Sequence, residues 1–300
     1  MRKIMVIAVA AACALALTAC GGDGGDNDST STRTDEGIWG YASSADQNGN
    51  QNVVQTVILS DGSYWGVYGN IFGAGCFQAD SILHGTASVS GSNASGAYID
   101  FNSIFESFGM SNSVPINGTY AGTVSTKNNL NLTFNDGSTS IGDISSLSDI
   151  NMSYDGIYNQ PASLSSIAGN YQESLNGCVD AGSGLIPASA PGEATPQSPI
   201  QSVSYSLSIS GSNLSLAQSY NGSTNVIMTG TIAPHGTAVN VFDVNLETTA
   251  NAAATGSVLN GPGIILYTGI LFQTSGVLKN NIEIVATSGD GSALFYMGTK

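Results

Sequence analysis

Short runs of β-branched and aromatic residues recur along almost the whole chain, separated by Gly, Asn, Ser and Asp. Two of these runs, Val53–Leu59 and Tyr64–Tyr68, flank an Asp61-Gly62 pair, which is typical of a β-hairpin. Only one short segment, Ser163–Ala168, has the pattern of a helical turn. The sequence therefore predicts an all-β fold of antiparallel strands that form a barrel or a sandwich.

The first residues are typical of an export signal. Arg2 and Lys3 precede an apolar run, Ile4–Leu17, that is shorter than the roughly 20 residues of a membrane-spanning helix. Leu17-Thr18-Ala19-Cys20 resembles the lipobox of bacterial lipoproteins, a family in which the cysteine is acylated and becomes the first residue after cleavage. This resemblance implies a signal peptide at residues 1–19 and a lipid, including palmitate, on Cys20.

A Gly- and Asp-rich segment follows the lipobox and is expected to be a flexible tether over residues 20–35. Gly21 directly follows Cys20, where an Asp would resemble an inner-membrane retention signal. We therefore expect a lipid-anchored protein of the bacterial outer membrane, facing the periplasm or the cell surface.

The composition sets limits on the partners. The net charge is −15 and only 9% of residues are charged, so the basic footprint of a nucleic-acid binder is missing. A hydrophobic content of 41% argues against wholesale disorder. Contact with the membrane is expected through the lipid, and the candidate partners are a glycan, a small ligand or an envelope protein.

A weak internal repeat divides the chain after the tether. Ile82–Thr86 matches Ile227–Thr231, and Lys127–Leu132 matches Lys279–Ile284, in the same order in both halves. We predict two related β modules, at about 36–150 and 160–300. The proline-containing segment 182–199 in the second module is expected to be an exposed loop.

Besides the lipobox and tether, four segments carry a family resemblance: Glu36–Gly40, Val57–Trp65, Ser163–Tyr171 and Phe295–Lys300. They are similar to segments of a group of uncharacterised proteobacterial outer-membrane lipoproteins. The resemblance implies the same location and an all-β fold. It implies no activity and supplies no catalytic residue.

Two cysteines remain for the folded part, Cys76 and Cys178. An exported protein meets an oxidising compartment, so a disulfide between the two modules is predicted. Two separate thiols are the alternative, because the sequence does not show whether the two Cα atoms approach each other.

Candidate catalytic and metal-binding groups are sparse. His84 and His235 lack the spacing of a zinc site, and Asp46–Asn50 fits a hairpin tip better than a calcium loop. Asp100 and Asp243 are the best pair for a hydrolase that uses two carboxylates, but solvent-facing strand acids are the simpler interpretation. We predict no enzymatic activity, no metal and no cofactor.

The remaining candidates are aromatic. Trp39, Tyr64, Trp65 and Tyr68 are candidate ligand contacts, and strand alternation places Tyr64 and Tyr68 on one face and Trp65 on the other. The alternative is that they fill the core. The sequence favours a non-enzymatic structural or binding module, with a small-ligand or glycan-binding β-barrel as the alternative and a hydrolase as a third possibility.

Overall fold

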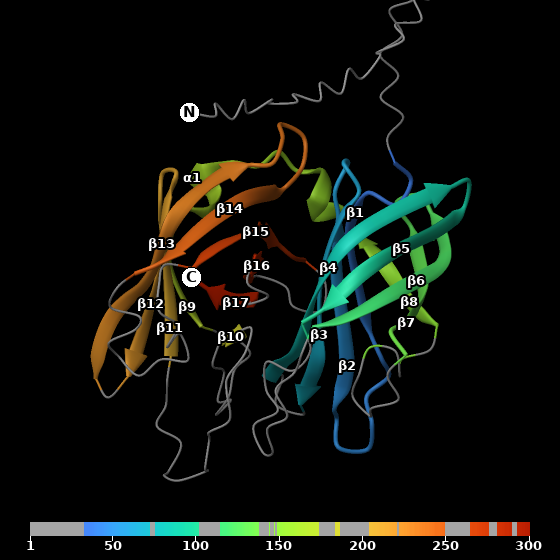
Figure 1. Cartoon of the computed structure of the whole chain (residues 1–300), viewed down its shortest axis with the longest axis horizontal. Helices are drawn as coiled ribbons and strands as arrows, with labels where there is room; N and C mark the ends of the chain where they lie inside the picture. Colours follow the sequence, from blue (N-terminus) through green and yellow to red (C-terminus); the bar gives the residue numbers. More distant parts are fainter. Residues whose placement is uncertain are drawn as a thin grey trace, which may run out of the picture. The chain divides into compact units, whose positions relative to one another are not determined.

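The structure is a computed structural model of the chain (Figure 1). The described residues belong to one compact unit, Thr32–Lys300. They are 33–72, 76–101, 115–137, 144, 147, 149–173, 184–186, 204–220, 222–249, 265–275, 281–289 and 293–300.

The first eight strands form a closed antiparallel barrel, coloured blue to green in Figure 1. Each strand pairs with the next one along the chain, and β1 pairs with β8 through Ile38↔Asp155 and Gly40↔Ser153. The strands are β1 (Gly37–Ala42), β2 (Gln51–Ile58), β3 (Ser63–Phe72), β4 (Cys76–Ser90), β5 (Asn93–Asp100), β6 (Ile116–Ser125), β7 (Asn129–Asn135) and β8 (Ile150–Asp155).

A second antiparallel ring follows, coloured yellow to red. It closes where β17 pairs with β9 through Gly298↔Glu173 and Thr299↔Gln172. Its strands are β9 (Gly169–Glu173), β11 (Ser204–Ser210), β12 (Asn213–Tyr220), β13 (Ser223–Pro234), β14 (Val241–Thr248), β15 (Leu266–Gln273), β16 (Ile282–Ser288) and β17 (Ala293–Thr299). The all-β prediction is confirmed, and of its two alternatives the barrel is correct.

The connection between the barrels contains two short helical turns. Asp155 accepts a hydrogen bond from the Ile157 amide and so caps the 3-10 helix η2 (Gly156–Asn159). The helix α1 (Leu164–Ile167) lies within the predicted helical segment. The expected loop at 182–199 is partly wrong, because β10 (Gly184–Ile186) pairs with β17. Its other residues lie outside the described ranges.

The internal repeat corresponds to equivalent strands. Gly85 lies in the fourth strand of the first barrel and Gly230 in the fourth strand of the second. At both positions a Cβ atom would overlap a carbonyl oxygen of the neighbouring strand, that of Ala97 or of Asn245. The two barrels therefore bring their fourth and fifth strands together in the same way, and the prediction of two related modules is confirmed.

The close approach of the β14 backbone to Gly230 leads to a prediction about stability. We expect Gly230→Ala to lower the free energy of unfolding by about 1–3 kcal/mol, because the neighbouring backbone must shift to admit the methyl group. Gly289→Ala is the control, since a Cβ there meets nothing within 4 Å. Denaturant unfolding followed by circular dichroism checks both variants. An unchanged midpoint for Gly230→Ala would contradict the strand packing.

Each barrel has its own apolar interior. The first contains Trp39, Tyr64, Leu83 and Leu132. The second is filled mainly by aliphatic residues of β11 to β17 and by Tyr171, Tyr267 and Tyr296.

A third apolar cluster, here called the inter-barrel core, joins the outer faces of the two barrels. It contains Val57, Trp65 and Phe77 from the first barrel and Phe272 and Phe295 from the second. The rings of Phe77 and Phe295 meet edge to face, with their centroids 6.0 Å apart. Along β3, Trp65 faces the inter-barrel core, whereas its neighbour Tyr64 faces the barrel interior. The strand is therefore buried on both faces.

One ionisable side chain lies among these apolar residues. Glu283 is fully buried on β16, and Val285 of the same strand face belongs to the inter-barrel core. Its strand neighbours are Phe272 and Met297. Neither carboxylate oxygen has a hydrogen-bond partner in the part of the chain that is described. Burial raises the pKa of Glu283 to about 8.

Candidate functional site

The four candidate aromatic residues are core residues. Trp39, Tyr64 and Tyr68 lie inside the first barrel, and Trp65 lies in the inter-barrel core. The predicted alternation along β3 is therefore confirmed. None of the four is more than 7% exposed, so the idea that they form an open stacking surface is wrong. Because β3 is buried on both faces, neither Tyr64 and Tyr68 on one face nor Trp65 on the other is open to solvent.

The histidines have separate structural roles. The His84 ring stacks on Trp65, with 3.7 Å between the ring centroids, and its Nδ1 lies 3.1 Å from the Tyr64 carbonyl oxygen. Burial lowers the pKa of His84. His235 Nδ1 lies 2.8 Å from Asp243 Oδ1. Within the described ranges, no group of three or more His, Cys, Asp or Glu could hold a metal ion.

The two candidate carboxylates are not a pair. Asp100 is fully buried in the first barrel, where it accepts hydrogen bonds from Ser81 Oγ and from Tyr68 OH at 3.4 Å. Asp243 lies on β14 of the second barrel, with its side chain half exposed beside His235. These two acids therefore do not form a two-carboxylate site, and the expectation that both face solvent is wrong for Asp100.

Asp46 organises a hairpin tip, as its sequence context predicts. Its Oδ1 accepts hydrogen bonds from the amides of Asn48 and Asn50, both at 2.8 Å. The hydrogen bond from the Asn50 amide lowers the pKa of Asp46.

The predictions for the cysteines stay predictions. Cys20 and Cys178 lie outside the described residues, as do the signal peptide and almost all of the tether. Cys76 begins β4, but its side chain also lies outside what is described.

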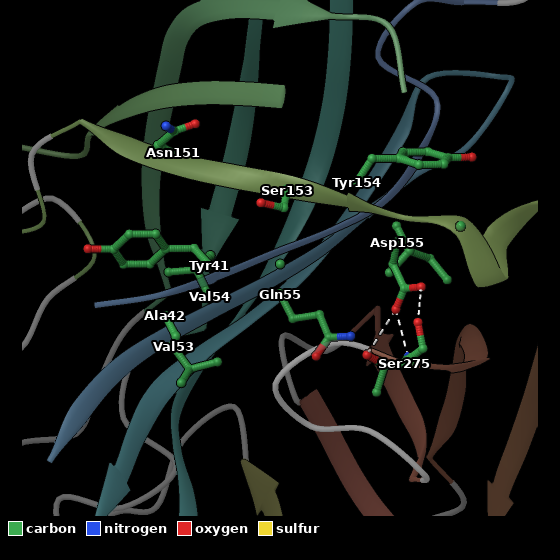
Figure 2. A pocket seen from close by; sticks show the side chains of 14 residues that line it. Tyr41, Ala42, Val53, Val54, Gln55, Asn151, Ser153, Tyr154, Asp155 and Ser275 are labelled. Atoms are coloured by element: carbon green, nitrogen blue, oxygen red, sulfur yellow. Dashed lines mark hydrogen bonds between the residues drawn. The ribbon is translucent and has the colours of Figure 1, made fainter. Parts of the chain in front are cut away.

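A cleft of about 390 Å³ lies on the outer face of β1, β2 and β8, beside the end of β15 (Figure 2). Small-molecule sites typically measure roughly 300–1,000 Å³. Side chains alternate along β1, where Trp39 faces the barrel interior and Ile38 faces outward to the inter-barrel core. Gly40 and Ala42 therefore point outward, like Ile38. The cleft is therefore a feature of the barrel wall and not of a barrel mouth.

Gly40 forms the hollow. It pairs with Gln55 on β2 and with Ser153 on β8, so the three residues form a row across the strands. A Cβ at Gly40 would meet no atom within 4 Å. The missing side chain leaves space between the Gln55 and Ser153 side chains on the outer face.

Gln55 supplies a buried polar group to this hollow. Its side chain is only 4% exposed, and it extends from β2 toward Ser275 (Figure 2). Among the described residues, no hydrogen bond to the Gln55 side-chain amide is found. The Gln55 amide atoms are not among the fully buried polar atoms of the described residues that lack a partner, so they are open to the cleft and available to a ligand that enters it.

Asp155 fixes the opposite wall. Its carboxylate accepts hydrogen bonds from the Ser275 amide at 2.7 Å, from Thr274 Oγ1 at 3.4 Å and from Ser275 Oγ. These contacts are drawn in part in Figure 2 and tie the end of β15 to the end of β8. Because the carboxylate already accepts several hydrogen bonds, it serves to shape the cleft.

This cleft was not predicted from the sequence, although the sequence contains two signals of it. Gln55 interrupts the apolar run Val53–Leu59, and Gly40 separates two aromatic residues. The strand pairing of β1 with both β2 and β8 was needed to place Gln55, Gly40 and Ser153 side by side.

The comparisons with known proteins provide no function. No family model and no curated protein matches the chain. A solved structure of a DUF3598-family protein of unknown function from Nostoc punctiforme covers 89% of this chain and 97% of its own, at 10% identity. Its TM-score is 0.24, which is too low to support any inference.

A search of the described residues finds no helix with both the length and the apolar character of a membrane span.

Proposed function

We propose that this protein is a lipid-anchored, non-enzymatic outer-membrane lipoprotein that binds a small ligand. The observation that supports binding is the cleft around Gly40, which is lined by the Gln55 amide, a group with no hydrogen-bond partner among the residues that the structure describes. The lipobox-like sequence ending at Cys20 supports the anchor. The tether would hold the double barrel away from the membrane surface, where a soluble ligand can reach it.

A purely structural role in the cell envelope is the second candidate. It is favoured by the filled interiors of both barrels, where large aromatic and aliphatic side chains occupy the space that a ligand would need. Binding in a barrel mouth is therefore not proposed. The cleft on the outer wall is the feature that favours a binding role over a structural one.

The anchor makes a direct prediction. In cells that express the protein and are labelled with radioactive palmitate, we expect Cys20→Ala to abolish the label. Cys178→Ala is the matched control and is expected to keep it. Equal labelling of the Cys20→Ala variant would contradict lipidation at this residue.

The binding function is tested on the full lipoprotein purified in detergent. We expect a screen of soluble metabolites and glycans by ligand-observed NMR to detect at least one binder. A screen in which every compound behaves as it does with unrelated protein would favour the structural role.

A further inference from the structure

The chemistry of the cleft wall also constrains the ligand. We propose that the cleft takes a neutral, hydroxyl-rich molecule of the size of a small sugar, held by the Gln55 amide. This inference rests on the proposed binding function and names the class of its ligand.

Charge argues against anionic ligands. None of the fourteen described residues that line the cleft is Lys, Arg or His, and Asp155 is the only one of them with a carboxyl group. The whole chain has a net charge of −15. A phosphate or carboxylate would therefore enter without a counter-charge and against repulsion.

Cationic ligands fit poorly for a different reason. The carboxylate of Asp155 in the cleft wall already accepts hydrogen bonds from Ile157, Thr274 and Ser275. A cation would have to displace these contacts, which also tie β8 to the end of β15.

Apolar ligands fit poorly because of Gln55. An apolar molecule that filled the hollow would remove the Gln55 amide from water without offering it a hydrogen bond, which is costly. A hydroxyl group can both donate to the amide oxygen and accept from the amide nitrogen. The exposed Asn151 and Ser153 side chains on β8 offer further polar contacts along the same wall.

The geometry provides a way to close the cleft. Gly40 has open space at its Cβ position, and its φ lies outside the range that favours glycine, so Gly40→Phe is expected to fill the hollow without disturbing the strand. Gly289→Phe is the matched control, because Gly289 also has open space and does not line the cleft.

The test is calorimetric titration of the full lipoprotein in detergent with four sets of probes. The neutral probes are glucose, galactose, N-acetylglucosamine and maltose, and the anionic probes are glucuronate and glucose 6-phosphate. Spermidine is the cationic probe, and toluene, which has no hydrogen-bonding group, is the apolar one. We expect at least one neutral sugar to bind the unmodified protein and Gly289→Phe, and to give no measurable heat with Gly40→Phe.

A second variant keeps the test valid if Gly40→Phe folds poorly. Gln55→Leu keeps the size of the side chain and removes its amide, and we expect it to weaken the binding of the neutral sugar about tenfold or more. Unchanged affinity in Gln55→Leu would overturn the assigned role of the amide.

The remaining outcomes separate the two proposals. If only a charged or apolar probe binds, and Gly40→Phe abolishes it, the ligand class is wrong and the binding function stands. If a sugar binds Gly40→Phe as tightly as the unmodified protein, the cleft is not the site: the neutral-sugar proposal for the cleft fails, whereas the binding of a small ligand stands. If no probe of any set binds, the neutral-sugar proposal is overturned, and the metabolite screen decides the binding function.

Discussion

Replacing Phe295 by alanine is expected to lower the free energy of unfolding by about 3–5 kcal/mol, the usual cost of removing a buried aromatic ring. Phe295 is fully buried on β17 and meets Phe77 of the first barrel edge to face. Because it belongs to the inter-barrel core, its removal should destabilise both barrels.

The positions of the two tryptophans of the chain allow the unfolding of the first barrel to be followed separately. Trp39 and Trp65 both lie in the first barrel, whereas Phe295 lies in the second. Tryptophan fluorescence therefore reports on the barrel that does not carry the substitution. We expect Phe295→Ala to shift the denaturant midpoint equally by fluorescence and by far-UV circular dichroism.

The control is Leu266→Ala, which removes a side chain that is 63% exposed, and it should change stability by about 0.5 kcal/mol or less. If Phe295→Ala shifted the circular dichroism transition and left the fluorescence transition in place, the two barrels would be independent units and the inter-barrel core would not couple them.

Replacing Glu283 by glutamine is expected to raise stability at neutral pH by about 3 kcal/mol. The folded protein keeps the Glu283 proton up to a pH of about 8, whereas the unfolded chain releases it near the ordinary pKa of 4.5. The free energy of unfolding therefore falls as the pH rises between these two values. Glu283→Gln carries no titrating proton, so its advantage should be small at pH 4.5 and should grow toward pH 8.

The matched control for this prediction is Glu247→Gln, an exposed acid on β14 of the same barrel. We expect this surface substitution to change the free energy of unfolding by about 0.5 kcal/mol or less. Urea midpoints measured at several pH values between 4.5 and 8 check both variants. Parallel curves for the unmodified protein and Glu283→Gln would mean that Glu283 is not buried as described.

The strands were largely predictable because local signals set them. Asp61-Gly62 marks the β2–β3 turn, and the alternation at Tyr64, Trp65 and Tyr68 was correct because a strand turns successive side chains to opposite faces. The choice between barrel and sandwich was not predictable. It depends on whether β1 meets β8 and whether β17 meets β9, pairings between residues far apart in the sequence.

The site was harder to predict because its residues become neighbours only through strand pairing. Ser153 lies more than a hundred positions from Gly40, and Ser275 comes from the other barrel. The prediction that aromatic residues such as Trp65 form an open contact surface for a ligand was wrong for a related reason. Packing between two barrels buries the outer face of β3. The run Tyr64–Tyr68 is apolar on both faces, which is consistent with a strand covered on both sides but does not identify the covering element.

The most direct test of the central claim, that a small molecule occupies the cleft around Gly40, is native mass spectrometry. The unmodified protein, Gly40→Phe and Gly289→Phe are each incubated with the same small-molecule extract of a bacterial envelope. We expect an added mass on the unmodified protein and on Gly289→Phe, and none on Gly40→Phe. An identical added mass on all three, or none on any, would contradict the claim.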